Sequence, residues 1–162
     1  MKNIIQRIFG INNTQNIFIE SKSVSIDIIP QDIEFILDYI NENAPEIFKK
    51  NPIIVPDLDK KNKLNGINRN QFDMILEDVP LFYDIETSIR EDNSNSLKKK
   101  YYNAARILNL QYMNKYQKNF PEFVIQVAKT FYNDNTFNKD KTIKLVTLMH
   151  YMYHECDLGI KP

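Results

Sequence analysis

Residues 24–40 read VSIDIIPQDIEFILDYI, and the spacing of the apolar residues changes within this stretch. Ahead of Pro30, valine and isoleucine alternate with polar residues, which is the period of a half-buried strand. After Pro30 the apolar residues recur at intervals of three and four, which is the period of a helix; they are Ile33, Ile36, Leu37 and Ile40. Proline suits the first turn of a helix, and Asp32 complements its positive end. We therefore expect a helix that begins at Pro30 and ends near Asn43.

The segment before this helix has the pattern of a small β element. Ile17 and Ile19 show the same alternation, and Gly10 with the nearby asparagines supplies turn chemistry. A sheet of two or three short strands is marginal alone, so it must pack on the helices or on a partner. We predict a β-hairpin or meander in residues 1–29 and a helical domain in residues 30–162, within a single domain overall.

The rest of the chain carries helical patterns separated by turn residues. Asn68 followed by Gln71 resembles a capping box ahead of a short helix. Apolar stripes then predict helices over 81–90 and about 97–118, another that begins near Pro121, and a last one from near Lys139 that stops before Gly159. The polar stretch 51–65, with its two prolines, is predicted to be a connection. The chain is therefore predicted to be mainly α, a helical bundle of about six helices.

Composition narrows the possible functions. The formal net charge of the 162 residues is +0, so the chain lacks the overall positive field that attracts nucleic acid non-specifically. Cys156 is the only cysteine, which excludes an internal disulfide and agrees with a reducing compartment. No apolar run approaches the ~20 residues of a membrane span, and the N-terminal segment lacks the pattern of a secretory signal. We expect a cytoplasmic protein without a membrane partner.

The two histidines invite a metal hypothesis. His150 and His154 are four residues apart, so both lie on one helical face, where two imidazoles could reach a common metal. Cys156 lies about 200° round the helix from His154 and cannot join them without a break in the helix. We therefore expect no metal site and no cofactor, and interpret Cys156 as a small apolar core residue.

Short motifs that resemble nuclease fragments lack the rest of a catalytic set. Glu20 and Lys22 have the E-x-K spacing without an upstream acid, and Asp57, Asp59 and Lys61 are crowded into one connection. A hydrolytic metal site needs several carboxylates that converge from rigid elements. The three glycines of the chain cannot build a phosphate-binding loop. We predict that the chain is not an enzyme.

Charge is unevenly distributed along the chain. Residues 30–46 contain acids and no cation, and residues 73–92 are also strongly acidic. Residues 97–118 contain no acid, and their cations are interleaved with tyrosines; the cations are Lys98, Lys99, Lys100, Arg106, Lys115 and Lys118. Such a mixture is found where proteins bind nucleic acid, and Lys98, Lys99, Lys100 and Lys115 are the candidates. The alternatives are a solvated face, or a face that docks on acidic helices of the same chain or of a partner.

The tyrosines outnumber the positions that one core stripe per helix can absorb. Tyr102 lies about 100° from Tyr101, near the Lys98 and Arg106 positions, and Tyr151 departs from the Met149 and Met152 face. Tyrosine beside a cation is typical of an interface anchor. We predict a partner-contact surface that includes Tyr102, Arg106 and Tyr151; packing of these tyrosines between helices is the alternative.

Three segments resemble a known family. The closing stretch HYMYHECDLG (150–159) is similar to the end of the C-terminal domain of ABC-three-component systems, and KLNGINRNQF (63–72) and KYYNA (100–104) resemble its middle portion. The resemblance covers roughly residues 60–162. It implies a bacterial antiviral defence system of the Lamassu-like kind, directed against phages or plasmids, with an ABC/SMC-like ATPase, a middle component and an effector.

Within such a system the resemblance implies a non-catalytic adaptor. The domain would link the effector to the middle component and the ATPase through protein-protein interaction, and it would meet nucleic acid only through the complex. Family members usually carry an effector enzyme ahead of this domain, whereas about 60 residues precede it here. No catalytic residue carries over, because the matching positions are structural in character.

Overall fold

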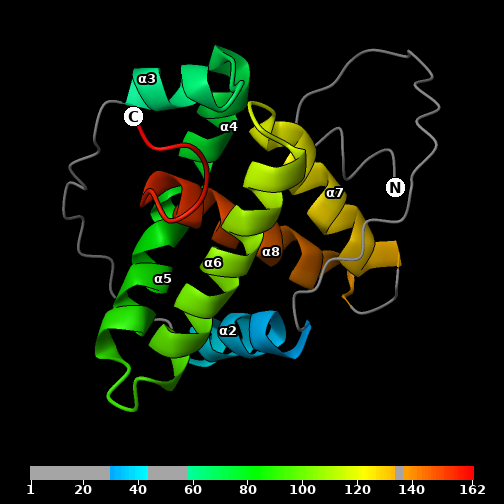
Figure 1. Ribbon diagram of the computed structural model, residues 1–162. Helices are drawn as coiled ribbons and strands as arrows, with labels where there is room; N and C mark the ends of the chain where they lie inside the picture. The colour runs from blue at the N-terminus through cyan, green and yellow to red at the C-terminus, as the bar shows by residue number, and fades with distance from the viewer. Residues whose placement is uncertain (1–29, 44–57, 134–136) are drawn as a thin grey trace.

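The computed structural model describes residues 30–43, 58–133 and 137–162 (Figure 1). In these ranges the chain forms seven helices and no strand; the helices are α2 (Pro30–Asn43), α3 (Leu58–Leu64), α4 (Arg69–Glu77), α5 (Val79–Glu91), α6 (Ser96–Lys115), α7 (Phe120–Asn133) and α8 (Lys139–His154). The prediction of a mainly helical fold is confirmed. The β element predicted for residues 1–29 lies outside the described residues. None of the helices in the described part has the length and apolar character of a membrane span.

Helix starts follow the local signals in the sequence. Pro30 is the first residue of α2, as predicted. Ahead of α4 the predicted capping box is complete: Gln71 N donates to Asn68 Oδ1 at 3.0 Å, and Asn68 N donates to Gln71 Oε1 at 2.9 Å. Asn138 caps α8 by accepting a hydrogen bond from Lys141 N at 2.9 Å. These caps satisfy amide groups that have no partner within a helix.

The connection predicted for residues 51–65 is wrong over its second half, because Leu58–Leu64 forms α3. This helix reads LDKKNKL and carries no apolar stripe from which a helical period could be predicted. Its buried residues are instead polar, Lys61 and Asn62. A seven-residue helix is unstable in isolation, so α3 depends on contacts with distant parts of the chain.

The last helix is the centre of the fold. Residues 145–154 of α8 are all buried, and α8 packs against α2, α5 and α7. Figure 1 shows α8 passing behind α6, and the Tyr101 and Tyr151 rings join these two helices with centroids 5.9 Å apart. This part of the helix is buried on every side and has no polar face, so the pattern of residues 145–154 does not follow the amphipathic rule.

The acidic helix α2 packs on α5, α6 and α8. Ile33 and Ile36 are fully buried, and burial of each aliphatic side chain contributes about 1.5–3 kcal/mol. Lys100 of α6 pairs with Asp32, and Lys141 of α8 pairs with Glu34 and Asp38. Exposed ion pairs contribute about 0–1 kcal/mol each, so apolar burial dominates and the charges orient the helix. Lys100 thus docks on an acidic helix of the same chain, which was one of the alternative interpretations of the basic residues 97–118.

Candidate functional site

The three segments with the family resemblance meet at one place in the structure. Residues 155–160, which we call the C-terminal turn, follow α8 and lie beside α3 (Figure 1). They contact the loop between α3 and α4 through Asn65 and contact α6 through Tyr101, whose hydroxyl donates to Asp157 Oδ2 at 2.8 Å. Burial raises the pKa of Tyr101, and the neighbouring Asp157 carboxylate adds to the effect. The phenol is therefore held in its neutral, donating form.

Asn65 is the centre of a group of buried polar contacts between α3, α6 and the C-terminal turn, which we call the Asn65 cluster. It is 0% exposed, and its amide nitrogen donates to Lys61 O at 2.8 Å and to Ile160 O at 2.9 Å. Its amide oxygen accepts from Tyr112 OH at 2.9 Å and from Ile160 N at 2.7 Å. Its backbone oxygen accepts from Phe120 N at 3.0 Å. One side chain with all four hydrogen-bonding positions filled thus ties together α3, α6 and the C-terminal turn.

Residues with positive φ lie on both sides of the cluster, in the loop after α3 and in the C-terminal turn. Gly66 has φ +68° and Gly159 has φ +93°, a region that residues with a Cβ rarely adopt. A Cβ at Gly159 would lie 2.8 Å from Asn65 Oδ1. Cys156 also has positive φ, because the chain reverses there: Asp157 N and Leu158 N both donate to Met152 O. Cys156 therefore lies beyond α8 and is half-buried, so the interpretation of Cys156 as a core residue is wrong.

Lys61 is the unexpected member of the cluster. It is 0% exposed, its amine donates to Tyr153 O, and its Nζ lies 4.0 Å from the centroid of the Tyr153 ring. Burial lowers the pKa of Lys61 from its ordinary value of 10.5, against opposing contributions from Cys156 and Asp157. Next to it, Asn62 Oδ1 accepts from Tyr153 OH at 2.9 Å. Lys61 and Asn62 together fix the end of α8 against α3.

The lowered pKa of Lys61 predicts a pH dependence of stability. Between that lowered pKa and 10.5, the unfolded chain binds the lysine proton more tightly than the folded protein does. Unfolding then takes up a proton, so raising the pH in this window favours the folded state. We expect the free energy of unfolding of the wild type to increase relative to that of Lys61→Met as the pH rises towards 10.5. Urea titrations at several pH values measure this difference, and a difference independent of pH would contradict the assignment.

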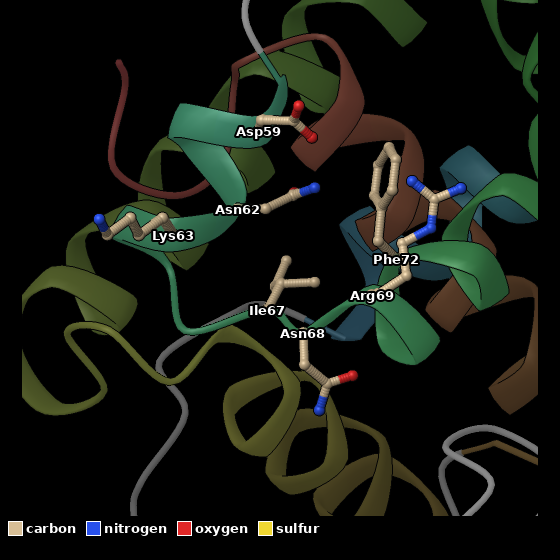
Figure 2. Close-up of a pocket in the computed structure, with 7 residues that line it drawn as sticks. All are labelled: Asp59, Asn62, Lys63, Ile67, Asn68, Arg69 and Phe72. Atoms are coloured by element: carbon tan, nitrogen blue, oxygen red, sulfur yellow. The ribbon is translucent and has the colours of Figure 1, made fainter.

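A pocket of about 270 Å³ opens between α3 and α4 beside this cluster (Figure 2). Asp59 and Asn62 lie on one side, Phe72 and Arg69 on the other, and Ile67 between them, while the Lys63 side chain points away. Arg69 Nε is paired with Asp73 Oδ1 at 3.0 Å. The volume lies below the ~300–1,000 Å³ of typical small-molecule sites, so the pocket fits a single side chain better than a cofactor.

The histidines of α8 do not converge on a common point. His150 Nδ1 lies 2.7 Å from Asp78 Oδ2, and His154 Nδ1 lies 2.8 Å from Glu155 Oε1. Each ring thus uses one nitrogen on a different carboxylate. In the described part of the chain, no group of three or more histidine, cysteine, aspartate and glutamate side chains is arranged to hold a metal ion.

The profile of one family, described as C-terminal domain 12 of the ABC-three component (ABC-3C) systems, matches residues 22–159, which is most of the chain. The chain belongs to this family. No match was found among curated proteins, nor among solved structures. The ABC-3C match begins well before residue 60, where the resemblance noted in the sequence begins, and takes in α2 as well as the cluster around Asn65.

The structure separates the residues predicted for partner contact in this ABC-3C domain. Tyr102 is 50% exposed and Arg106 is also exposed, both on α6. Tyr151 is 5% exposed and packs between Phe82 and Tyr101, so the expectation that it lies at the surface is wrong. The helical-wheel argument failed because residues 145–154 of α8 are buried on every side. Contact of Tyr102 and Arg106 with a partner stays a prediction.

The basic residues predicted to bind nucleic acid differ in whether their charge is free or paired within the chain. Lys98, Lys99 and Lys115 are exposed, whereas the amine of Lys100 is engaged with Asp32. Lys61, Asn62 and Asn65 were missed as site residues because a polar run without period gives no sign of burial. A signal was present in the Asn65-Gly66 pair of the segment that resembles the family, since Asn-Gly is typical of a tight turn.

Proposed function

We propose that this chain is a non-catalytic adaptor subunit of an ABC-3C defence system in the bacterial cytoplasm. It links the effector to the middle component and to the ABC/SMC-like ATPase. Membership of the ABC-3C family supports a role among other subunits. The adaptor role itself is supported by the polar residues of the Asn65 cluster, which are buried and hydrogen-bonded to one another.

The observation that carries this proposal is the closure of the Asn65 cluster. Asn65 has no free hydrogen-bonding position, Lys61 has no exposed surface, and Tyr101 is 2% exposed. The described buried side-chain atoms without a partner are on Thr87, Ser88 and Gln111, outside the cluster. Catalysis requires a reactive group that substrate can reach. A cluster whose polar groups all bond to one another instead holds the helices rigidly. A rigid scaffold can present a surface to a partner.

Co-purification tests the proposal. The chain carries an affinity tag and is co-expressed with the other components encoded beside it, and the eluate is analysed by size-exclusion chromatography with light scattering. We expect a complex that contains this chain in fixed stoichiometry. The control is the tagged chain expressed without its neighbours. A chain that elutes alone although its neighbours are expressed and folded would contradict the adaptor role.

Nucleic-acid binding is the second candidate function. It is favoured by the exposed cations of α6, Lys98, Lys99 and Lys115, on a helix that contains no acid. Affinity for DNA or RNA that falls steeply with salt, and that disappears when Lys98 and Lys99 are neutralised, would support it. Lys100 contributes less than predicted because Asp32 already neutralises it.

A further inference from the structure

Two exposed apolar side chains lie together on α6. Among the described residues, the large hydrophobic side chains with the greatest exposure are Leu110, at 56%, and Tyr102, at 50%. They are eight residues apart, which is about two turns or ~12 Å along the helix axis. Arg106 is exposed midway between them. Residues at intervals of four lie about 40° apart around a helix, so Tyr102, Arg106 and Leu110 form one face, which we call the α6 stripe.

Cations of α6 lie beside the α6 stripe. Helix α6 contains no acid, and Lys98 and Lys99 are exposed one turn before the stripe. Lys100 is the exception, because it is paired with Asp32 of α2 on another face. An apolar stripe flanked by cations fits a surface of opposite charge, since complementary potentials orient the partners and exclude others.

We propose that the α6 stripe docks an acidic amphipathic helix of another ABC-3C component, with aliphatic side chains flanked by aspartate or glutamate. The proposal rests on the proposed adaptor function and names its contact surface. The chain already shows this pairing on a different face of α6, where α2 inserts Ile33 and Ile36 and places Asp32 against Lys100. Tyrosine and arginine are the residues that most often dominate binding energy at interfaces. Leu110 extends the contact over two helical turns.

The composition of the stripe favours protein over nucleic acid. Its two ends are apolar, and only Arg106 between them carries charge. Leu110 is the most exposed large hydrophobic residue among those described, and an aliphatic side chain gains little from a phosphate backbone. A partner helix buries Tyr102 and Leu110 together, whereas a nucleic acid would use the tyrosine ring alone.

Affinity measurements on surface variants test the proposal. Purified Tyr102→Ala, Arg106→Glu and Leu110→Ala chains are compared with wild type for binding to the immobilised complex of the other components. We expect each affinity to fall about tenfold or more. The melting temperature is expected to stay within about 2 °C of wild type for Arg106→Glu and Leu110→Ala, and to fall by a few degrees for Tyr102→Ala, which also loses an edge contact with the Tyr101 ring. Lys139→Glu and Ile143→Ala are the matched controls, exposed on α8 away from the stripe, and are expected to bind as wild type.

The outcomes separate this proposal from the adaptor role. If wild type binds the other components and the three variants bind equally well, the α6 stripe is not the contact surface and the adaptor role stands. If wild type does not bind them, both proposals fail. Two further results would overturn the stripe as a docking site for a partner helix. One is DNA binding lost in Arg106→Glu while partner binding is unchanged, and the other is a wild-type dimer that Leu110→Ala converts to a monomer.

Discussion

Replacing Gly66 with alanine is expected to destabilise the protein by roughly 3–5 kcal/mol, enough to unfold many domains of this size. Gly66 has φ +68°, and an added Cβ would lie 1.9 Å from the backbone oxygen of Lys118. The left-handed conformation alone costs an alanine about 1–2 kcal/mol. The clash adds to this, because the neighbour is backbone and cannot rotate away. Relief requires the loop after α6 to move, and Phe120 of that region is bonded to Asn65.

Urea denaturation of Gly66→Ala measures this effect, with Asn95→Ala as the matched control. Asn95 also has positive φ, at 56°, but it is exposed and precedes α6 without a side-chain cap. We expect Asn95→Ala to lose only about 1 kcal/mol, the conformational part of the cost. Equal losses in the two variants would show that the contact with Lys118 O does not constrain the fold.

Asn65→Leu is expected to destabilise the protein by roughly 3 kcal/mol or more. Leucine has the same number of side-chain heavy atoms as asparagine but offers no hydrogen bond, so Tyr112 OH and both backbone groups of Ile160 lose a partner. Each buried polar group left without a partner costs about 1–3 kcal/mol. The loss falls on the contact between α3 and the C-terminal turn, so limited proteolysis is expected to remove the last residues of the variant first.

Tyr112→Phe is the control for this variant. It removes a single donor from Asn65 Oδ1, which keeps its bond from Ile160 N, so we expect a loss of about 0.5–1.5 kcal/mol. Unfolding curves of the two variants are compared under the same conditions. An Asn65→Leu loss no larger than that of Tyr112→Phe would show that the C-terminal turn is held by other contacts.

The sequence predicted those elements whose signals are local. Helix α2 begins at Pro30 and ends at Asn43 as expected, because proline, the acid in the first turn and the apolar spacing lie within the helix itself. The capping box at Asn68 and Gln71 is equally local, with both bonds formed between residues three apart. Such signals need no knowledge of the partner elements.

What could not be predicted depends on distant residues. Lys61 is buried because Tyr153, 92 residues away, supplies both an acceptor carbonyl and a ring. A lysine in a polar run gives no indication of such a partner, and α3 was therefore missed. The burial of Tyr151 was missed for a related reason, since whether a helix has one packed face or several is decided by its neighbours.

The segments that resemble the family located the site better than the histidines and the E-x-K motif did. The segments 63–72 and 150–159 contain Asn65 and the C-terminal turn, which the structure brings together. The histidines and the E-x-K pattern were candidates for a metal site or a nuclease site because of the chemistry of their side chains. The structure pairs the histidines with different carboxylates, and Glu20 and Lys22 lie outside the described residues.

Omission of this chain from the assembled system tests the proposed linking role most directly. The components of the ABC-3C system are co-expressed with and without the chain, the effector is tagged, and the mass of the recovered complex is measured by light scattering. The adaptor role predicts that the middle component and the ATPase are recovered with the effector only when this chain is present. Recovery of the same complex in its absence would contradict the account.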